Sequence, residues 1–243
     1  MTVIDVAFTL EELAPDRLAD VAAVVIDVVR ASTTIVTALA HGARAVVPVA
    51  TPEEARTRAR GWLDGSVLIG GERGGAPPPG FECGNSPAEY VPARVHSRTV
   101  IFTTTNGTRA LLAVGGARSV AVAGFVNAGA VVKWLIRRPG DVLLVCAGDS
   151  GRFCLEDATC AGLLVGGLRA ARPGVWVSDA ARAAGILYTH YASDLGWMLD
   201  QAVWAQMLVT QGRGADLPLC AAVDVYDVVP VLRGGELIPG GRD

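Results

Sequence analysis

The chain carries, at residues 24–34, the stretch VVIDVVRASTT, an apolar run that meets an acid and a base and then small hydroxyl side chains. Such a run is typical of a buried strand, and the segment Thr33–His41 after it has the apolar spacing of a helix. Burying Asp27 and Arg30 costs solvation free energy unless a partner or a ligand compensates each charge. The stretch therefore predicts a strand–helix junction that carries a site.

Short β-branched runs alternate with alanine-rich helical segments along the rest of the chain. This alternation predicts an α/β fold, a layered α/β/α arrangement with a mixed, largely parallel sheet. The expected strands are Ala22–Val28, Ala45–Val49, Val67–Gly70, Thr99–Thr103, Ser119–Ala123, Val142–Cys146 and Cys220–Val225. The expected helices are Thr33–His41, Pro52–Arg60, Ala128–Arg138, Glu156–Arg169 and much of Ser178–Gln211. We expect one domain over residues 1–243. It could consist of two lobes, near 1–115 and 116–243.

Composition indicates a folded globular protein and argues against several classes of function. Of the 243 residues, 51% are hydrophobic and 19% charged, and the net charge is −3. The scattered basic residues give no sign of a nucleic-acid partner. No apolar stretch approaches the ~20 residues of a membrane span, and the N-terminal residues lack the pattern of a signal peptide. Five cysteines without CxxC pairs fit free thiols in a cytoplasmic protein.

Three strand ends share one pattern, an apolar run followed by small, polar and glycine residues and then by a helix. They are IDVVRASTT, FTTTNGTRA and VCAGDSGRFCLED. Ligands of open α/β sheets bind outside the carboxyl ends of strands, where helix N-termini favour anions. The Gly- and Pro-rich segment 70–87 is long for a connection without secondary structure, which favours a functional loop over a surface insertion. We therefore expect a pocket at this edge.

Carboxylates, hydroxyls and amides are the chemical groups that these segments offer. P-loop, dinucleotide-binding and serine-hydrolase motifs are absent. Asp27, Glu156 and Asp157 suit Mg²⁺, which prefers oxygen ligands and often bridges to a substrate phosphate. A structural reading stays open for each, since Glu156 and Asp157 could complement a helix dipole and Arg30 could simply pair with Asp27.

A competing motif is Cys146 followed by Arg152, the Cys-x5-Arg spacing of cysteine-dependent phosphatases. In such enzymes a thiolate attacks phosphorus and the arginine binds its oxygens. The spacing alone is weakly specific, and Phe153 stands where a hydroxyl residue is usual. Cys146 could equally be a buried structural cysteine.

Taken together, six blocks resemble the 2-phosphosulfolactate phosphatase family. They are VIDVVRASTTIVTAL, GERGG, GFECGNSPAEY, TTTNGTRAL, CAG followed by LEDATCAG, and CAAVDVYDVVP. They occur in order from about residue 22 to residue 231, so the resemblance covers nearly the whole chain. It implies Mg²⁺-dependent hydrolysis of 2-phospho-3-sulfolactate to sulfolactate and phosphate, in the route to coenzyme M.

On this resemblance we expect Asp27, Arg30, Glu156 and Asp157 to be catalytic, with Mg²⁺ held by Asp27, Glu156 and Asp157. Arg30 would neutralise phosphoryl oxygens, and whether Asp27 instead attacks phosphorus stays open. The residues expected to bind the small anionic phosphoester are Ser32, Thr33, Glu72, Arg73, Asn85, Ser86, Thr105, Asn106, Gly107, Thr108, Arg109, Asn127 and Gly148.

Two further alternatives from the sequence are a phosphatase for another small phosphorylated hydroxy-acid and a non-catalytic anion-binding protein. The apolar helical stretch Trp197–Val209 could belong to the core or form the face of a homodimer.

Overall fold

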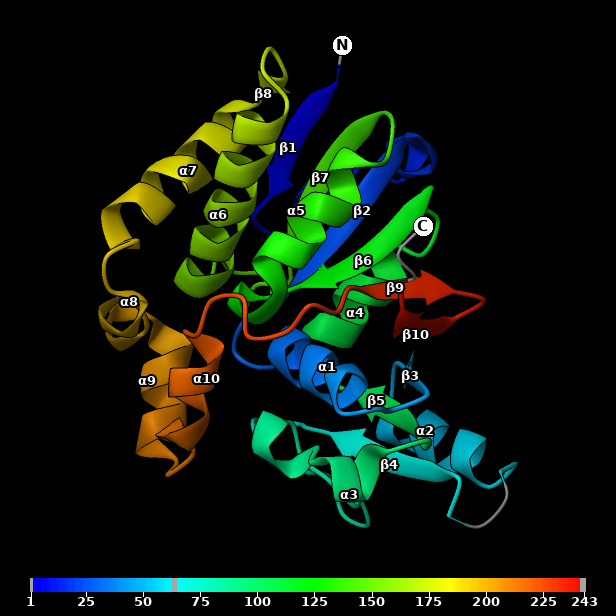
Figure 1. The fold of residues 1–243 in the computed structure, drawn as a ribbon. Helices are drawn as coiled ribbons and strands as arrows, with labels where there is room; N and C mark the ends of the chain where they lie inside the picture. Colours follow the sequence, from blue (N-terminus) through cyan, green and yellow to red (C-terminus); the bar gives the residue numbers. More distant parts are fainter. Residues whose placement is uncertain (1, 63–64, 241–243) are drawn as a thin grey trace.

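A computed structural model describes residues 2–62 and 65–240. Within them the strands form one mixed sheet in the order β4-β5-β3-β10-β9-β6-β2-β7-β1-β8 (Figure 1). The strands are β1 (Val3–Ala7), β2 (Val21–Ile26), β3 (Ala45–Pro48), β4 (Val67–Gly71), β5 (Thr99–Thr103), β6 (Ser119–Ala123), β7 (Asp141–Cys146), β8 (Trp176–Val177), β9 (Pro230–Arg233) and β10 (Glu236–Pro239). The expected layered α/β architecture with a largely parallel sheet is confirmed.

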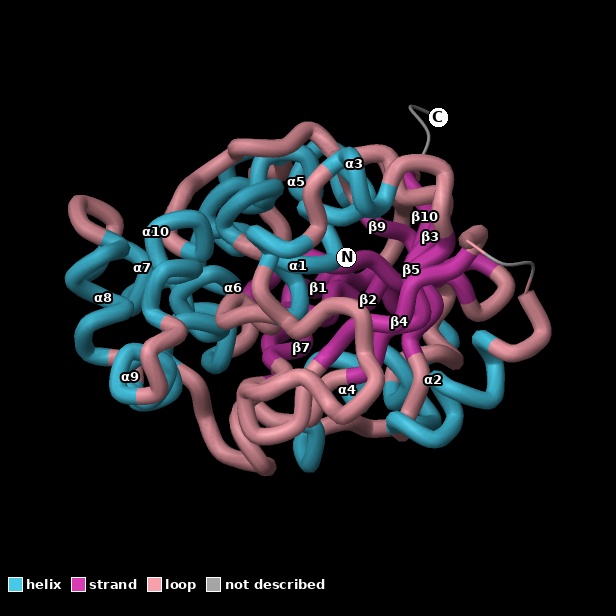
Figure 2. The backbone as a smooth tube through the Cα atoms, turned by 90° about the horizontal axis from the view of Figure 1, so that it is seen from below, coloured by secondary structure: helices cyan, strands magenta, loops and turns pink. Residues whose placement is uncertain are grey.

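Helices cover both faces of this sheet. They are α1 (Ala31–Ala40), α2 (Pro52–Ala59), α3 (Pro92–Val95), α4 (Gly107–Ala113), α5 (Ala128–Ile136), α6 (Leu155–Ala171), α7 (Asp179–Tyr191), α8 (Leu195–Gln201), α9 (Val203–Thr210) and α10 (Leu217–Cys220). Helices α7–α10 gather at one end of the molecule, away from β3, β4 and β5 (Figure 2). None of the helices in the described ranges is both long enough and apolar enough to cross a membrane.

Strand β2 shows how the sequence builds the two layers. Its side chains alternate between the faces, as the period of a strand requires. Val24 and Ile26 join the core formed with α5 and α6, whereas Ala23 and Val25 join the core formed with α1 and α4. Both faces are apolar because β2 lies inside a sheet that is covered on both sides.

The hairpin β9–β10 joins two parallel groups of strands. On one side lie β3, β4 and β5, and on the other β6, β2, β7, β1 and β8. The hairpin pairs antiparallel with each group through a single residue pair, Leu237 with Val46 and Val231 with Ala121. Three antiparallel steps would orient the groups oppositely in a flat sheet. The chain segments after β2, β4, β5 and β7 nevertheless line one cavity, so the sheet must turn at the hairpin.

The expected strand Cys220–Val225 is wrong. Cys220 ends α10, and the residues after it run as irregular backbone beside the turn Phe125–Asn127. Asp224 and Tyr226 donate their N–H groups to the carbonyls of Phe125 and Val126, but Asp224 has φ +54°, which breaks an extended ladder.

The other expected elements occur, β5 and β6 with the expected ends and the rest with shifted ends. The helical region Ser178–Gln211 divides into α7, α8 and α9, because Asp194 caps α8 and Ala202 has extended backbone. Strands β1, β8, β9 and β10 were not predicted. The β9–β10 hairpin did carry a signal, since Gly234 and Gly235 separate two short apolar runs.

Candidate functional site

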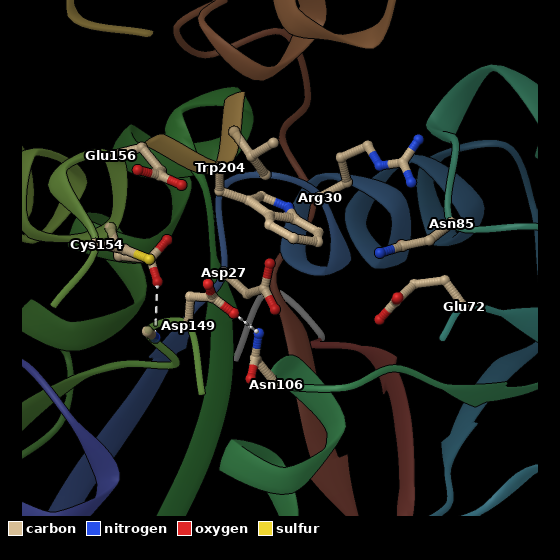
Figure 3. Close-up of a pocket in the computed structure, with 12 residues that line it drawn as sticks. Asp27, Arg30, Glu72, Asn85, Asn106, Asp149, Cys154, Glu156 and Trp204 are labelled. Atoms are coloured by element: carbon tan, nitrogen blue, oxygen red, sulfur yellow. Dashed lines mark hydrogen bonds between the residues drawn. The ribbon is translucent and has the colours of Figure 1, made fainter. Parts of the chain in front are cut away.

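A narrow cavity lies where several strand ends meet (Figure 3). It encloses about 390 Å³ of empty space, with its open mouth included. Its walls come from the β2–α1 junction, the loop after β4, the β5–α4 junction, the β7–α6 connection and α9. The lining residues are Asp27, Val29, Arg30, Glu72, Asn85, Asn106, Gly148, Asp149, Cys154, Glu156, Asp157 and Trp204. The structure thus brings Asp27, Glu156 and Asn106 to one place.

Asp27 follows β2 and is held by backbone donors. Its Oδ1 accepts the N–H of Ala31 at 3.1 Å, and the backbone N–H of Gly107 also stabilises its charge. A Cβ atom at Gly107 would lie 2.6 Å from Asp27 Oδ2 and 2.7 Å from the Ala31 side chain. Only glycine at position 107 therefore lets α4 begin this close to the carboxylate.

Asp157, in the first turn of α6, joins two strand ends. Its Oδ1 accepts the N–H of Val28 at 2.8 Å, and its Oδ2 accepts the N–H of Gly148 at 3.2 Å. The neighbouring Glu156 is 3% exposed. Both acids occupy the helix N-terminus, where the dipole favours negative charge.

Burial raises the pKa values of these acids. The pKa of Asp27 rises to about 6. Burial is the main cause, the hydrogen bond from the N–H of Ala31 lowers the pKa, and the charge of Glu72 raises it. The pKa of Glu156 rises to about 7 through burial and the charges of Asp27 and Asp149. Burial, Asp27 and Glu156 also hold the pKa of Asp157 well above its ordinary value. The carboxylates disfavour one another's ionised form, as expected where no cation separates them.

Glu72 fixes the long loop to the end of β5. Its carboxylate accepts the N–H of Thr105 at 2.7 Å and the N–H of Gly75 at 2.8 Å, and it is 5% exposed. The segment 70–87 is therefore anchored at the cavity. Asn85 from the same loop lies between Arg30 and Glu72 (Figure 3).

Arg30 lies on the cavity wall, but its guanidinium points away from Asp27 (Figure 3). It donates from Nη1 to Asp216 Oδ2 at 2.7 Å and from Nη2 to the carbonyl of Gly75 at 3.1 Å. Arg30 and Asp216 are 3% and 7% exposed, so this is a buried ion pair. Asp216, 186 positions later in the chain, thus supplies part of the compensation that the buried charge of Arg30 requires.

The other predicted substrate-binding residues do not line the cavity in this structure. They are Ser32, Thr33, Arg73, Ser86, Thr105, Gly107, Thr108, Arg109 and Asn127. Arg109 is exposed, beside Glu11 and Leu112. Arg73 donates to the carbonyls of Glu72 and Ala50 and to Thr103.

Several hydroxyl and amide groups in that set have structural hydrogen bonds. Ser32 accepts the N–H of Asp27, and the Thr33 hydroxyl donates to the carbonyl of Val28. Thr108 exchanges hydrogen bonds with Thr104. Asn127 is fully buried, and its side chain hydrogen-bonds the backbone of Gly124, Val122 and Val228.

Four residues that line the cavity were not predicted from the sequence, namely Val29, Asp149, Cys154 and Trp204, and neither was Asp216, which pairs with Arg30. Asp149 and Cys154 lie inside the quoted strand end VCAGDSGRFCLED, so attention to that segment could have found them. Asn106 donates to Asp149 at 3.4 Å. Trp204 and Asp216 come from the C-terminal helical region and carry no local signal.

The cysteine motif has no support in the geometry. Cys146 is fully buried in the core beside α6, and burial raises the pKa of its thiol well above the ordinary value. Arg152 is exposed. Cys154 lines the cavity, but burial and Asp157 raise its pKa far above the ordinary value as well. Neither thiol is set up as a thiolate nucleophile.

The donor set fits a hard divalent cation in its chemistry. Among the described residues neither Asp27 nor Glu156 forms an ion pair, and Asn85 Oδ1 is buried with no hydrogen-bond partner. Such an atom on a cavity wall calls for a ligand. In the described ranges no three His, Cys, Asp or Glu side chains are already clustered as a metal site. Any ion would therefore draw on water, amide or substrate oxygens as well.

Comparisons with known proteins agree on one family. The profile of the 2-phosphosulpholactate phosphatase family matches residues 7–235. A protein of Symbiobacterium thermophilum is 43% identical over 92% of this chain and 96% of its own length. One of Thermotoga petrophila is 41% identical over 89% and 91%, and one of Caldanaerobacter subterraneus subsp. tengcongensis is 37% identical over 87% and 88%. Each is named probable 2-phosphosulfolactate phosphatase.

Proposed function

We propose that this chain, which belongs to the 2-phosphosulpholactate phosphatase family, is a Mg²⁺-dependent phosphatase. Its reaction is the hydrolysis of 2-phospho-3-sulfolactate to 3-sulfolactate and phosphate. The observation that carries the proposal is the lining of the cavity, which combines five carboxylates with one arginine at the ends of strands.

The charges at the cavity explain why a cation is needed. Asp27, Glu72, Asp149, Glu156 and Asp157 line it, and among the described residues on its wall Arg30 is the only basic one. A substrate that carries phosphate, sulfonate and carboxylate groups would be repelled by this wall. The terminal nitrogens of Arg30 already bond Asp216 and Gly75, which limits what Arg30 can offer. A divalent cation offsets part of this negative charge and gives the anionic groups of the substrate a direct positive partner.

Mg²⁺ would be held by Asp27, Glu156 and Asp157, the set expected from the sequence. When bound, the ion polarises a phosphoryl oxygen and lowers the pKa of a bound water. Asp157 contributes chiefly by fixing the N–H groups of Val28 and Gly148, because each of its oxygens accepts one of them.

The remaining residues orient the substrate and exclude water. Asn85 from the loop after β4 and Asn106 from the β5–α4 junction present amide groups to the cavity from the same strand group. Glu72 keeps the long loop docked through Thr105 and Gly75. Phosphoryl transfer depends mainly on positioning and electrostatics, which such a wall supplies.

The biological setting follows from the same proposal. The substrate and product place the reaction in the route to coenzyme M. Free thiols at all five cysteines are compatible with a cytoplasmic protein. The partner is the small anionic phosphoester. A homodimer through Trp197–Val209 stays a prediction. The exposed apolar side chains of Trp197, Val203 and Val209 would favour it.

The direct test is phosphate release by the purified full chain from 2-phospho-3-sulfolactate. We expect turnover with Mg²⁺, loss of turnover with EDTA, and recovery on adding Mg²⁺ back. A panel of phosphorylated hydroxy-acids tests the alternative substrates in the same assay. Binding of sulfolactate without turnover of any phosphoester would contradict the proposal and indicate an anion-binding protein.

Asp27→Asn should lower kcat/KM by roughly three orders of magnitude, about 4 kcal/mol, with the far-UV circular dichroism unchanged. The reason is the loss of a charged ligand next to the reacting phosphate. Cys146→Ser is the matched control, because only a thiolate mechanism needs that sulfur. If Cys146→Ser were inactive and Asp27→Asn active, the cysteine mechanism would replace ours.

A further inference from the structure

The segment α9–α10 contributes a carboxylate whose position suggests a role in the site. Asp216 ends the short turn Gly214–Asp216 before α10. Its Oδ2 accepts from Arg30 Nη1 at 2.7 Å, and its Oδ1 accepts from the Ser86 hydroxyl at 2.6 Å. With 7% of its surface exposed, it connects the β2–α1 junction and the long loop to the C-terminal helices.

Arg30 lies between two cavities. One is the carboxylate-lined cavity, and the other is a more open space of about 520 Å³ that is also lined by Asn85, Ser86 and Asp216. Asp216 lines only the second. The ion pair therefore holds the guanidinium on the side away from Asp27 and Glu156, as its direction in Figure 3 shows.

Without the ion pair to Asp216, the Arg30 guanidinium would be attracted to the acids of the carboxylate-lined cavity, because Arg30 lines that cavity too. Asp27 lies only three positions earlier in the chain, and Glu72 lies on the far side of Asn85 (Figure 3). An arginine fork suits a carboxylate well. A guanidinium paired with Asp27 would occupy oxygens that a divalent cation needs.

We propose that Asp216 is a positioning residue that keeps Arg30 off the cavity carboxylates and so preserves them for the divalent cation. This inference rests on the proposed metal-dependent function. Asp216 does not line the carboxylate-lined cavity, so its effect on that cavity passes through Arg30.

The test is Mn²⁺ binding to the full chain, measured by electron paramagnetic resonance with the metal alone. Asp216→Asn should weaken Mn²⁺ binding at least about tenfold, comparable to the loss of a hydrogen-bond partner of a metal ligand, because the freed guanidinium would compete with the ion. Arg30→Gln should bind Mn²⁺ at least as tightly as the wild type. The double variant R30Q/D216N should return to within about threefold of the wild type, since no guanidinium remains to compete.

The control is Asp194→Asn, which removes one negative charge from the same helical region while keeping a side chain that can cap α8. It should leave Mn²⁺ affinity unchanged. If Asp216→Asn does not fold, Asp216→Ser, which leaves room for water beside the guanidinium, replaces it in the same cycle.

Two results would overturn the inference while the proposed function stands: undiminished Mn²⁺ binding in the folded Asp216 variant, or a double variant as weak as the single one. A wild-type chain that binds no Mn²⁺ and needs none for turnover would instead overturn the metal-dependent function, and this inference with it.

Discussion

At the residue scale, Glu156 shows how a buried acid of the candidate site lowers the free energy of unfolding. It is almost fully buried, and burial together with Asp27 and Asp149 raises its pKa from 4.5 to about 7. Between these two values the folded chain keeps a proton that the unfolded chain has released. The free energy of unfolding of the metal-free protein therefore falls as the pH rises from about 4.5 to about 7.

Glu156→Gln should stabilise the metal-free protein at pH 8, because the amide removes the need to ionise a buried group. We expect a gain of roughly 1 to 3 kcal/mol in the free energy of unfolding, and a smaller difference at pH 5. Urea unfolding in EDTA at the two pH values measures this. Glu53→Gln, at a side chain 78% exposed, is the control and should change little. A variant less stable than the wild type at pH 8 would contradict the argument.

Individual site residues could be predicted where charge interrupts an apolar pattern. Asp27, Glu156 and Asp157 are visible in this way, because an acid beside a buried run needs a compensating partner or ligand. Asp216 could not be found, since its partner Arg30 is 186 positions away and its own surroundings look like an ordinary helix start. Arg109 looked like an anion ligand on the sequence, but its helix turns it outward.

The start of α4 shows at the scale of elements how closely the chain must pack to form the site. The N-terminus of this helix approaches the end of β2 so tightly that a Cβ at Gly107 would meet Asp27 and Ala31. Because an added Cβ would meet the carboxylate itself, relieving that clash would displace Asp27.

Gly107→Ala should therefore lower kcat/KM at least about a hundredfold, as a displacement of about 1 Å can, while the far-UV circular dichroism stays that of the wild type. Gly166→Ala is the matched control. Gly166 lies inside α6 with no neighbour within 4 Å of its added Cβ, so alanine should stabilise that helix by up to about 1 kcal/mol and leave activity unchanged. Equal activity in the two variants would exclude the packing argument.

Elements could be predicted where strand and helix patterns are local. Strands β5 and β6 have the predicted ends, and the helix from Pro52 follows its capping signals. The prediction of a strand after Cys220 failed because the alternating valines of this segment resemble a strand. Its backbone instead hydrogen-bonds the irregular turn Phe125–Asn127. Hydrogen bonding to a distant turn leaves no periodic trace in a sequence.

At the scale of the whole molecule, the site depends on how the two strand groups are joined. Asp27 and Glu156 come from the β2 and β7 side, whereas Glu72 and Asn106 come from the β4 and β5 side. The β9–β10 hairpin lies between them. A loose hairpin would let the two halves of the cavity separate even if each half kept its own structure.

Leu237→Ala tests this coupling, because Leu237 is fully buried and its backbone pairs with Val46 of β3. The lost side chain should lower the free energy of unfolding by about 2–5 kcal/mol. The loosened junction should also raise KM and weaken Mg²⁺ activation at temperatures where the variant is still folded. The control is Ile238→Ala, on the opposite, partly exposed face of the same strand. Urea unfolding and Mg²⁺ titrations of the phosphatase rate separate the two effects. Wild-type kinetics in a destabilised Leu237→Ala protein would show that the strand groups stay aligned without the hairpin's core contact.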